Sequence, residues 1–502
     1  MHMKFLTKLM YTIHRILGTL LSILFFVWFL SAFVMMYHRF PRVSEKEKLQ
    51  KLELLTQTTD SLPDIAEVTG RLQGEKIRSL SLNRSLGQTL FEVRTHKGEL
   101  KLPATSSDTI FPIDKTLILR KASLWNKEAI ARIDTLQALD TWIPFEKLKK
   151  ELPIYKIHFK DKEKTELYVS SHSGEALQLS THKERVWAWL SAIPHWAYFS
   201  WLRQDTNLWR KTIFTLTILG CLMVFAGGWI TVDVWKKNRC RPHPTFSPYK
   251  KRWYHWHYVT GIFFGLFVLT FTFSGMMSLN GTPEWSAPNG KKAASPAKKI
   301  QALAVAPEQY RVDYREVLAK YPKTKEIKWS CFGNHPYYTL KEDKKVWYID
   351  AADSIMKPLD LTEEDILSAI RKLSKKDSTL QLPAVRISSL DHFETYYRDM
   401  SAMYRGQSQL PVWKVEINDA NNSVLYIHPK TAQIRLVDSA ARWKYWTYTA
   451  LHRMRLPGLN SNGMLRKGLL WVLLLGGTMV SATGVALSVY YIRKKYKKIK
   501  RE

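Results

Sequence analysis

Four histidines stand beside long uncharged segments of the chain, and their arrangement occurs twice. The motif His-x-x-x-Gly begins at His14 and recurs at His257, each time ahead of an apolar run. His195 and His452 each come before an Arg-Lys dipeptide and a further apolar run. Ligating side chains are costly to hold near lipid, so their presence at such positions indicates a functional role. Haem b takes an axial imidazole on each face, and we expect these histidines to bind two haem b groups.

The duplication assigns one histidine of each pair to each half of the chain. His14 and His257 each begin a helix that runs outward, so we expect them at one depth near the inner side, as an inner pair. By the same argument His195 and His452 form an outer pair. His38, at the outer end of the first apolar run, is an alternative ligand for the outer haem. Two haems at different depths would conduct electrons across a membrane.

Small residues follow the inner histidines on the same helix face. Gly18 and Ser22 lie one and two turns beyond His14, and Gly261 and Gly265 repeat this spacing in the second motif. Such residues would admit a flat macrocycle, although small residues also let membrane helices pack closely. Because the pattern occurs twice, we favour ligation.

Four segments without a charged residue or histidine must position these side chains. Each is long enough to cross the roughly 30 Å hydrocarbon layer of a membrane as a helix. Lysines and arginines cluster after the second and fourth segments and near the N-terminus, which indicates that these parts are cytoplasmic. The four segments are residues 16–37, 212–232, 258–280 and 468–492.

We expect the chain to divide at the ends of these segments. The predicted parts are membrane helix 1 with a short cytoplasmic N-terminus (1–38), a first outer region (39–208), membrane helix 2 (209–235), a basic cytoplasmic connector (236–252), membrane helix 3 (253–280), a second outer region (281–464), membrane helix 4 (465–492) and a basic cytoplasmic tail (493–502).

Both outer regions contain patterns typical of antiparallel hairpins. Apolar and polar residues alternate in 153–159 and again in 411–417, and a polar turn and a second strand follow each run. A third copy, 336–350, follows a short amphipathic helix that Pro322 ends. The predicted fold class is therefore a membrane α-helical protein, an internally duplicated four-helix bundle with α+β modules outside.

The chain is strongly basic, with a formal net charge of +32 from 76 Lys and Arg against 44 Asp and Glu. The cytoplasmic flanks account for only part of this charge, so the outer regions are basic as well. No nucleic-acid-binding motif accompanies the charge, and we therefore expect the lipid bilayer, and no nucleic acid, as a partner. A basic outer face would also attract anionic small ligands.

Several short motifs together resemble those of the PepSY-associated transmembrane family. They are His14-Arg-x-x-Gly with Ser31-Ala32, His257-x-x-x-Gly with Ser274-Gly275, Leu451-His452-Arg453, and the hairpin motif Tyr-Tyr followed by Val-Trp-Tyr-Ile-Asp at 337–350. The resemblance covers nearly the whole chain. Ala32 stands where the family usually has glycine.

The family is similar to iron-regulated membrane proteins that include di-haem ferric-siderophore reductases. The resemblance implies two haem b groups, with His14, His195, His257 and His452 as axial ligands of the haem iron. It also implies a multi-pass protein of the bacterial inner membrane whose PepSY-like modules lie in the periplasm. The implied activity is reduction of a ferric siderophore from Fe3+ to Fe2+ for iron acquisition, and no further catalytic residue is assigned.

The electron donor and the function class remain open at the level of the sequence. No Gly-x-Gly-x-x-Gly motif joins a strand to a helix, and no cytoplasmic region is long enough to bind nicotinamide or flavin, so electrons would come from a quinol or a separate electron-donor protein. The alternative is a non-enzymatic PepSY membrane protein that binds or restrains a periplasmic partner such as a peptidase. A permease is a third interpretation, disfavoured because four spans carry no charged relay.

Overall fold

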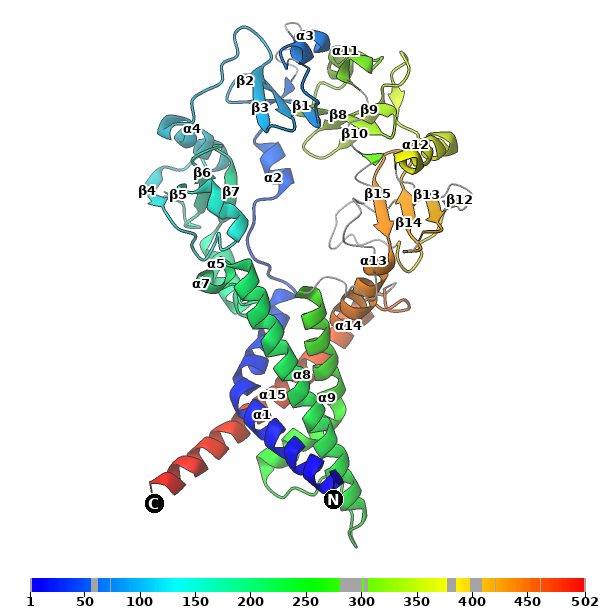
Figure 1. Ribbon diagram of the computed structural model, residues 1–502. Coiled ribbons are helices and arrows are strands. Elements are labelled where there is room, and N and C mark those ends of the chain that lie inside the picture. Colours follow the sequence, from blue (N-terminus) through cyan, green and yellow to red (C-terminus); the bar gives the residue numbers. More distant parts are fainter. Residues whose placement is uncertain are drawn as a thin grey trace.

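The computed structural model describes residues 2–55, 62–72, 74–279, 300–301, 306–376, 385–397, 409–419, 421–460 and 462–500. Four long helices form a bundle, and antiparallel sheets lie at one end of it (Figure 1). We call this the outer end, and the end that holds both chain termini the inner end. The predicted fold class, a membrane α-helical bundle with α+β modules, is therefore confirmed.

Each of the four long helices is apolar and long enough to cross a membrane. α1 and α9 each pack against both α8 and α15, so α1 and α9 face each other diagonally across the bundle. The two helices that carry a His-x-x-x-Gly motif therefore lie on opposite sides of the centre of the bundle. The bounds are α1 (His2–Met35), α8 (Thr206–Arg239), α9 (Arg252–Leu279) and α15 (Gly463–Ile499).

Glycines of α15 let aromatic rings come close to its backbone. A Cβ atom at Gly476 would overlap the ring of Phe264 on α9, and one at Gly477 would overlap the ring of Phe29 on α1. Close packing of this kind is a main source of helix association in lipid, where burial of apolar surface gives little driving force. The glycines thus fix how α15 sits against the two helices that carry the inner pair.

Each half of the chain contributes one four-stranded antiparallel sheet near the bundle. The hairpins predicted at 153–159 and 411–417 are the β5–β6 and β13–β14 pairs. The first sheet, in strand order, contains β4 (Ile130–Leu136), β5 (Ile154–Phe159), β6 (Glu166–Ser170) and β7 (Ala176–Ser180). The second contains β12 (Val385–Leu390), β13 (Val412–Ile417), β14 (Val424–Ile427) and β15 (Ile434–Val437).

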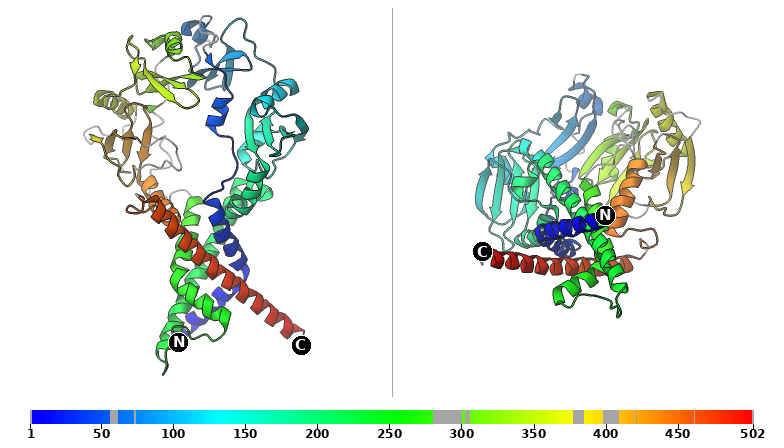
Figure 2. Two further views of the ribbon diagram at one scale, coloured as in Figure 1. Left: turned by 180° about the vertical axis from the view of Figure 1, so that it is seen from behind. Right: turned by 60° about the horizontal axis from the view of Figure 1, so that its bottom comes forward.

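The remaining strands of both halves join in one seven-stranded antiparallel sheet, in the order β11-β10-β9-β8-β1-β2-β3. At its centre β1 pairs with β8, with Leu80 opposite Trp329 and Leu82 opposite Ile327, all within one buried core. This sheet ties the two outer regions together at the end of the molecule farthest from the bundle (Figure 2). Its strands are β1 (Ser79–Ser85), β2 (Gln88–Arg94), β3 (Glu99–Pro103), β8 (Glu326–Phe332), β9 (His335–Lys341), β10 (Val346–Asp350) and β11 (Lys357–Pro358).

Short helices cover the sheets and connect them to the bundle. The amphipathic helix expected before Pro322 is α11 (Tyr314–Lys320), which buries Tyr314, Val317 and Leu318 against the seven-stranded sheet. The others near the sheets are α2 (Glu45–Gln50), α3 (Ile65–Gly70), α4 (Lys115–Trp125), η2 (Glu146–Glu151), η3 (Pro307–Gln309) and α12 (Glu363–Lys376). The connecting helices are α5 (His182–Leu190), α6 (Ala192–Trp196), α7 (Ser200–Arg203), α13 (Ser439–Lys444), the π-helix η5 (Tyr445–Ala450) and α14 (Leu451–Arg453).

Candidate functional site

The outer pair lies on two short helices between the sheets and the bundle. His195 is in α6, and His452 is in α14 directly after the π-helix η5, a rare conformation that is frequent at functional sites. Two residues beyond each histidine the chain adopts the left-handed conformation, at Ala197 and at Met454, each with a φ of 48°. The two halves therefore end their histidine helices in the same way.

These helices bring the two imidazoles together. The ring centroids of His195 and His452 are 6.3 Å apart, and the ring planes are inclined by 57°. Nδ1 of His195 lies 3.2 Å from the carbonyl oxygen of Trp28 on α1, and Nδ1 of His452 lies 3.2 Å from that of Phe271 on α9. Each ring is thus oriented by the first long helix of its own half.

The carbonyl group and a serine one turn beyond it together fix which ring nitrogen is protonated, because the carbonyl oxygen can only accept. Oγ of Ser31 lies 3.4 Å from Nδ1 of His195, and Oγ of Ser274 lies 3.0 Å from Nδ1 of His452. Each hydroxyl group donates its own proton to a carbonyl oxygen of its helix. The serine oxygen therefore accepts from the imidazole, which places the ring proton on Nδ1 and leaves the Nε2 lone pair for a ligand.

The inner pair has the same chemistry inside the bundle. The ring centroids of His14 and His257 are 6.1 Å apart, with the planes inclined by 41°. Nδ1 of His14 lies 2.9 Å from the carbonyl oxygen of Met223 on α8, and Nδ1 of His257 lies 3.0 Å from Oγ1 of Thr483 on α15. Because Thr483 donates its own proton to the backbone of α15, the proton between them belongs to His257.

Both separations fit one iron between two imidazoles. With metal–nitrogen bonds of about 2.0–2.1 Å, two rings on opposite sides of one metal have centres about 6.5 Å apart, close to the 6.1 and 6.3 Å observed. No cluster of three or more His, Cys, Asp or Glu side chains able to hold a metal ion occurs among the described residues. Two imidazoles without further protein ligands fit a haem, because its macrocycle supplies the other ligands.

The two pairs lie at different depths of the bundle. Trp28, whose carbonyl group orients His195, is about 21 Å along α1 from His14. Phe271, which orients His452, is the same distance along α9 from His257. The groups that orient the outer pair therefore lie about 21 Å along the helices from the inner pair, which is most of the roughly 30 Å thickness of an apolar membrane layer.

Glycines adjoin both rings of the inner pair. A Cβ atom at Gly227 on α8 would lie 2.7 Å from Cε1 of His14, so this position excludes any side chain. Gly484 on α15 faces His257 in the same way, but a Cβ atom there would lie at 3.6 Å, an ordinary contact distance. The ring of His14 is thus held more tightly than the ring of His257.

The small residues that follow His14 pack against α15. Oγ of Ser22 lies 3.2 Å from Oγ of Ser488, which also lies within hydrogen-bond distance of the carbonyl oxygen of Gly18. This is the close helix packing that was the alternative interpretation of these residues. At Gly261 and Gly265 on α9, by contrast, a Cβ atom would have no heavy atom of the described residues within 4 Å.

His38 lies outside both pairs. Its ring stacks on Trp187 of α5, with centroids 4.1 Å apart and planes inclined by 4°. The aromatic neighbours of the outer pair include Phe271, whose ring lies 5.9 Å from that of His452, and Tyr448, which stacks on His452 at 5.4 Å and accepts a hydrogen bond from Arg453 at 3.0 Å. The structure thus brings together His14 with His257 and His195 with His452, and leaves His38 apart.

A buried charged cluster that was not foreseen in the sequence lies in the second outer region. His335 on β9 bonds through Nε2 to Asp350 on β10 and through Nδ1 to Asp365 on α12, both at 3.0 Å. Burial alone would lower the pKa of His335, but the two carboxylates outweigh burial and raise it to about 9. The charged histidine joins two strands and a helix, which indicates a structural role.

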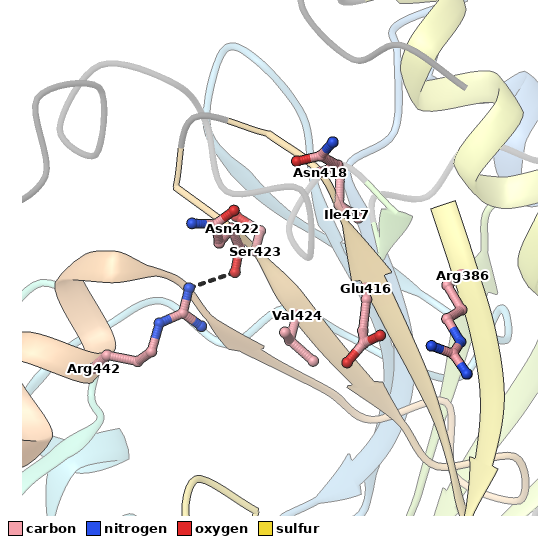
Figure 3. Close-up of a pocket in the computed structure, with 8 residues that line it drawn as sticks. All are labelled: Arg386, Glu416, Ile417, Asn418, Asn422, Ser423, Val424 and Arg442. Atoms are coloured by element: carbon pink, nitrogen blue, oxygen red, sulfur yellow. Dashed lines mark hydrogen bonds between the residues drawn. The ribbon is translucent and has the colours of Figure 1, made fainter. Parts of the chain in front are cut away.

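A cavity of about 540 Å³ lies at the turn end of the β13–β14 hairpin and contains none of the predicted site residues (Figure 3). Arg442 of α13 donates hydrogen bonds to the backbone of Asn421 and Asn422 there. Arg185 of the first half likewise bonds to the backbone of a hairpin turn, at Lys164. Arg442 therefore has a structural role that the duplication explains. The cavity is lined by Arg386, Glu416, Ile417, Asn418, Asn422, Ser423, Val424 and Arg442.

The sequence profile described as PepSY-associated TM region matches residues 11–494 of the chain. The match includes both histidine pairs, parts of all four long helices and both outer regions. No curated protein matches the chain.

Proposed function

Because the chain belongs to the PepSY-associated TM region family, we propose that it is a membrane electron-transfer protein that binds two haem b groups and reduces ferric siderophores. The observation that carries this proposal is the occurrence of two imidazole pairs with centroid separations of 6.1 and 6.3 Å. His14 and His257 would hold the inner haem, and His195 and His452 the outer one. When bound, each haem supplies an iron that changes valence.

The protein itself orients the four imidazole rings and keeps water out of the bundle core between the two histidine pairs. Hydrogen bonds that Nδ1 donates fix each imidazole ring and increase the basicity of Nε2. Between the two pairs the bundle core is aromatic, with Phe25 against Trp28 at 5.7 Å and Phe29 against Phe271 at 6.1 Å. An apolar environment of this kind keeps the reorganisation of solvent small when charge moves.

The substrate is proposed from charge and from the chemistry of iron. Ferric siderophores are often anionic, and a protein with a net charge of +32 attracts anions to its surface. Reduction to the softer Fe2+ ion of lower charge weakens binding by hard oxygen ligands and releases the metal. Reduction would therefore occur at the outer haem, beside the sheets.

The proposed location is the bacterial inner membrane, with the sheets in the periplasm. Lys236, Lys237 and Arg239 occupy the last turn of α8, and Lys497 and Lys498 the last turn of α15, both at the inner end. Basic residues in short flanks favour the cytoplasmic side. This orientation places both termini in the cytoplasm.

The test combines a spectrum with a reduction assay. Purified protein from cells with an adequate haem supply should show a b-type reduced-minus-oxidised spectrum, and the dithionite-reduced protein should be reoxidised by a ferric siderophore with release of chelatable Fe2+. Haem binding without reoxidation would remove the siderophore from the proposal. A haem-free protein would instead favour a non-enzymatic membrane protein that binds a periplasmic partner such as a peptidase.

A further inference from the structure

Asp233 is an unusual residue for its position in the bundle. It lies near the inner end of α8 and is the only Asp or Glu in the four long helices, whose backbones are fully described. An acidic side chain in a membrane helix is expensive and indicates function by default. The uncharged segments used to identify the helices end one residue before it, so the sequence patterns did not single it out.

The contacts of Asp233 involve one of its two oxygens. The hydroxyl group of Tyr11 donates a hydrogen bond to Oδ2 at 3.3 Å, and Nζ of Lys237 lies 2.6 Å from the same atom. Oδ1 accepts no hydrogen bond from the described residues. Because the tyrosine and the lysine both contact Oδ2, the other carboxylate oxygen, Oδ1, is left for a further hydrogen-bond donor.

Three more tyrosines lie close together at the same end of the bundle, two on α9 and one in the connector before it. The ring of Tyr249, in the connector between α8 and α9, lies 5.9 Å from that of Tyr254 and 5.6 Å from that of Tyr258. Burial, together with the proximity of Tyr11, the other two tyrosines and Asp233, raises the pKa of Tyr249 to about 12. We call these five residues, Tyr11, Asp233, Tyr249, Tyr254 and Tyr258, the inner tyrosine cluster.

One hydroxyl group of the cluster lacks a partner. Tyr258 is 7 % exposed, and its buried hydroxyl group forms no hydrogen bond with the described residues. A buried polar group in this state destabilises a fold unless a ligand satisfies it. Tyr11 and Tyr254 are each 39 % exposed, so the cluster is accessible from outside the bundle.

The cluster adjoins the inner histidine pair. Tyr11 precedes His14 by one turn of α1, and Tyr258 follows His257 directly on α9. An interfacial belt of tyrosines would explain the exposed rings, because such rings favour the membrane surface. It would not explain a carboxylate inside a membrane helix or a buried hydroxyl group without a partner.

We propose that the inner tyrosine cluster binds a membrane quinol and is the site at which the quinol is oxidised, an inference that rests on the proposed haem function. The tyrosine rings pack against the quinol ring, the hydroxyl group of Tyr258 bonds to one quinol oxygen, and Oδ1 of Asp233 accepts a proton from the other. Of the two electron donors that the sequence left open, this geometry favours the quinol.

The reaction balances with two haems in each chain. Oxidation of one quinol to the quinone breaks two O–H bonds and releases two electrons and two protons. Two bound haems, held by the inner and the outer histidine pair, would take up one electron each. One proton passes to Asp233 and from there to water at the inner surface, and the other passes to that water directly.

Binding is tested first, because it does not depend on haem chemistry. In nanodiscs, a photoreactive azidoquinone should label peptides that contain Tyr249 and Tyr258. Tyr258→Phe should weaken this labelling about five- to tenfold, as expected for the loss of one hydrogen bond to the ligand. Tyr496→Phe, at the same end of the bundle but outside the cluster, should leave the labelling unchanged. Labelling confined to other segments would overturn the proposal.

Electron transfer is tested on the haem-loaded protein by mixing it rapidly with decylubiquinol. Asp233→Asn should slow reduction by decylubiquinol at least about tenfold. A positioned base usually contributes more than this to a rate. Reduction by dithionite should be unchanged, and Asp233→Glu should recover part of the rate, which separates proton acceptance from a folding defect. Equal rates in the wild type and Asp233→Asn would contradict the proposed role of Asp233.

The two proposals fail in different ways. A protein without haem refutes the proposed function, while the azidoquinone labelling still decides whether a quinol binds. A haem-loaded protein that dithionite reduces and a ferric siderophore reoxidises, but that neither binds the azidoquinone nor reacts with decylubiquinol, refutes the quinol site alone. A separate donor protein is then the remaining source of electrons.

Discussion

The imidazole of His195 lies 6.3 Å from that of His452, centroid to centroid, although the two residues come from opposite halves of a duplicated chain. The inner pair is divided between the halves in the same way. Each half therefore carries one histidine of each pair, and neither half has a complete pair. Duplication here creates the pairs as well as the scaffold, because each pair of imidazoles requires both copies.

Gly227→Ala tests how tightly the ring of His14 is packed against α8. The new Cβ atom would lie 2.7 Å from Cε1 of His14 and would displace its ring. Overpacking in a tight core costs about 1–3 kcal/mol, so we expect the inner haem to bind roughly 5- to 150-fold more weakly. Haem titration of the purified variant measures this change. Gly484→Ala is the matched control, since its Cβ atom would lie 3.6 Å from His257; equal weakening in both variants would contradict the proposed geometry.

Thr483→Val tests the hydrogen bond that orients His257. The substitution keeps the shape of the side chain but removes the oxygen that accepts from Nδ1 at 3.0 Å. Loss of such a partner typically weakens metal binding about 10- to 100-fold, so the inner haem should be lost more readily and its midpoint potential should shift. Thr478→Val is the control on the same helix, because the Thr478 hydroxyl group bonds to its own backbone. A shift in the midpoint potential of the outer haem, with the inner haem unchanged, would contradict the assignment of Thr483 to the inner site.

His38→Ala distinguishes the two ligand sets considered for the outer haem. His38 stacks on Trp187 and lies outside the outer pair, so we expect the variant to retain both haems. Its stability should fall by about 0.5–1.5 kcal/mol, the usual contribution of an aromatic pair. A pyridine haemochrome assay and a thermal unfolding curve measure the two effects. Loss of one haem equivalent would make His38 a ligand.

The histidine between Asp350 and Asp365 predicts how stability depends on pH. The pKa of His335 rises from about 6.5 in the unfolded chain to about 9 in the fold. The protonated ring therefore stabilises the fold fully below pH 6.5, and this contribution, on the order of 3 kcal/mol, is lost as the pH rises through 9. The temperature at which half of the second outer region is unfolded should decrease as the pH is raised from 6.5 to 9.5. His335→Asn should flatten this dependence and the exposed His392→Asn should not; parallel curves for all three proteins would contradict the role of His335.

Much of the architecture follows from sequence patterns alone. Uncharged runs of membrane length predicted the four long helices, and alternation around polar turns predicted the β5–β6 and β13–β14 hairpins. Repetition predicted which histidines would be brought together, because duplicated halves place equivalent residues at equivalent depths. These features are local or periodic, so one sequence is enough to recognise them.

Other features depend on contacts that no pattern records. The seven-stranded sheet forms because β1 and β8, from different halves, pair through Leu80 and Trp329. The π-helix before His452 packs against α9, and Thr483, which orients His257, lies on α15. His335 finds its two carboxylates on separate elements, and Asp233 lies just beyond an apolar run. In each case the neighbours that give the residue its role are distant in the sequence.

The most direct test of the account is haem content per chain in four single variants. The wild type should contain two haem b equivalents, and His14→Ala, His257→Ala, His195→Ala and His452→Ala should each contain one. Difference spectra and midpoint potentials should show that the first two variants lack the same haem and that the last two lack the other. A wild type without haem, or histidine variants that retain both equivalents, would contradict the central claim.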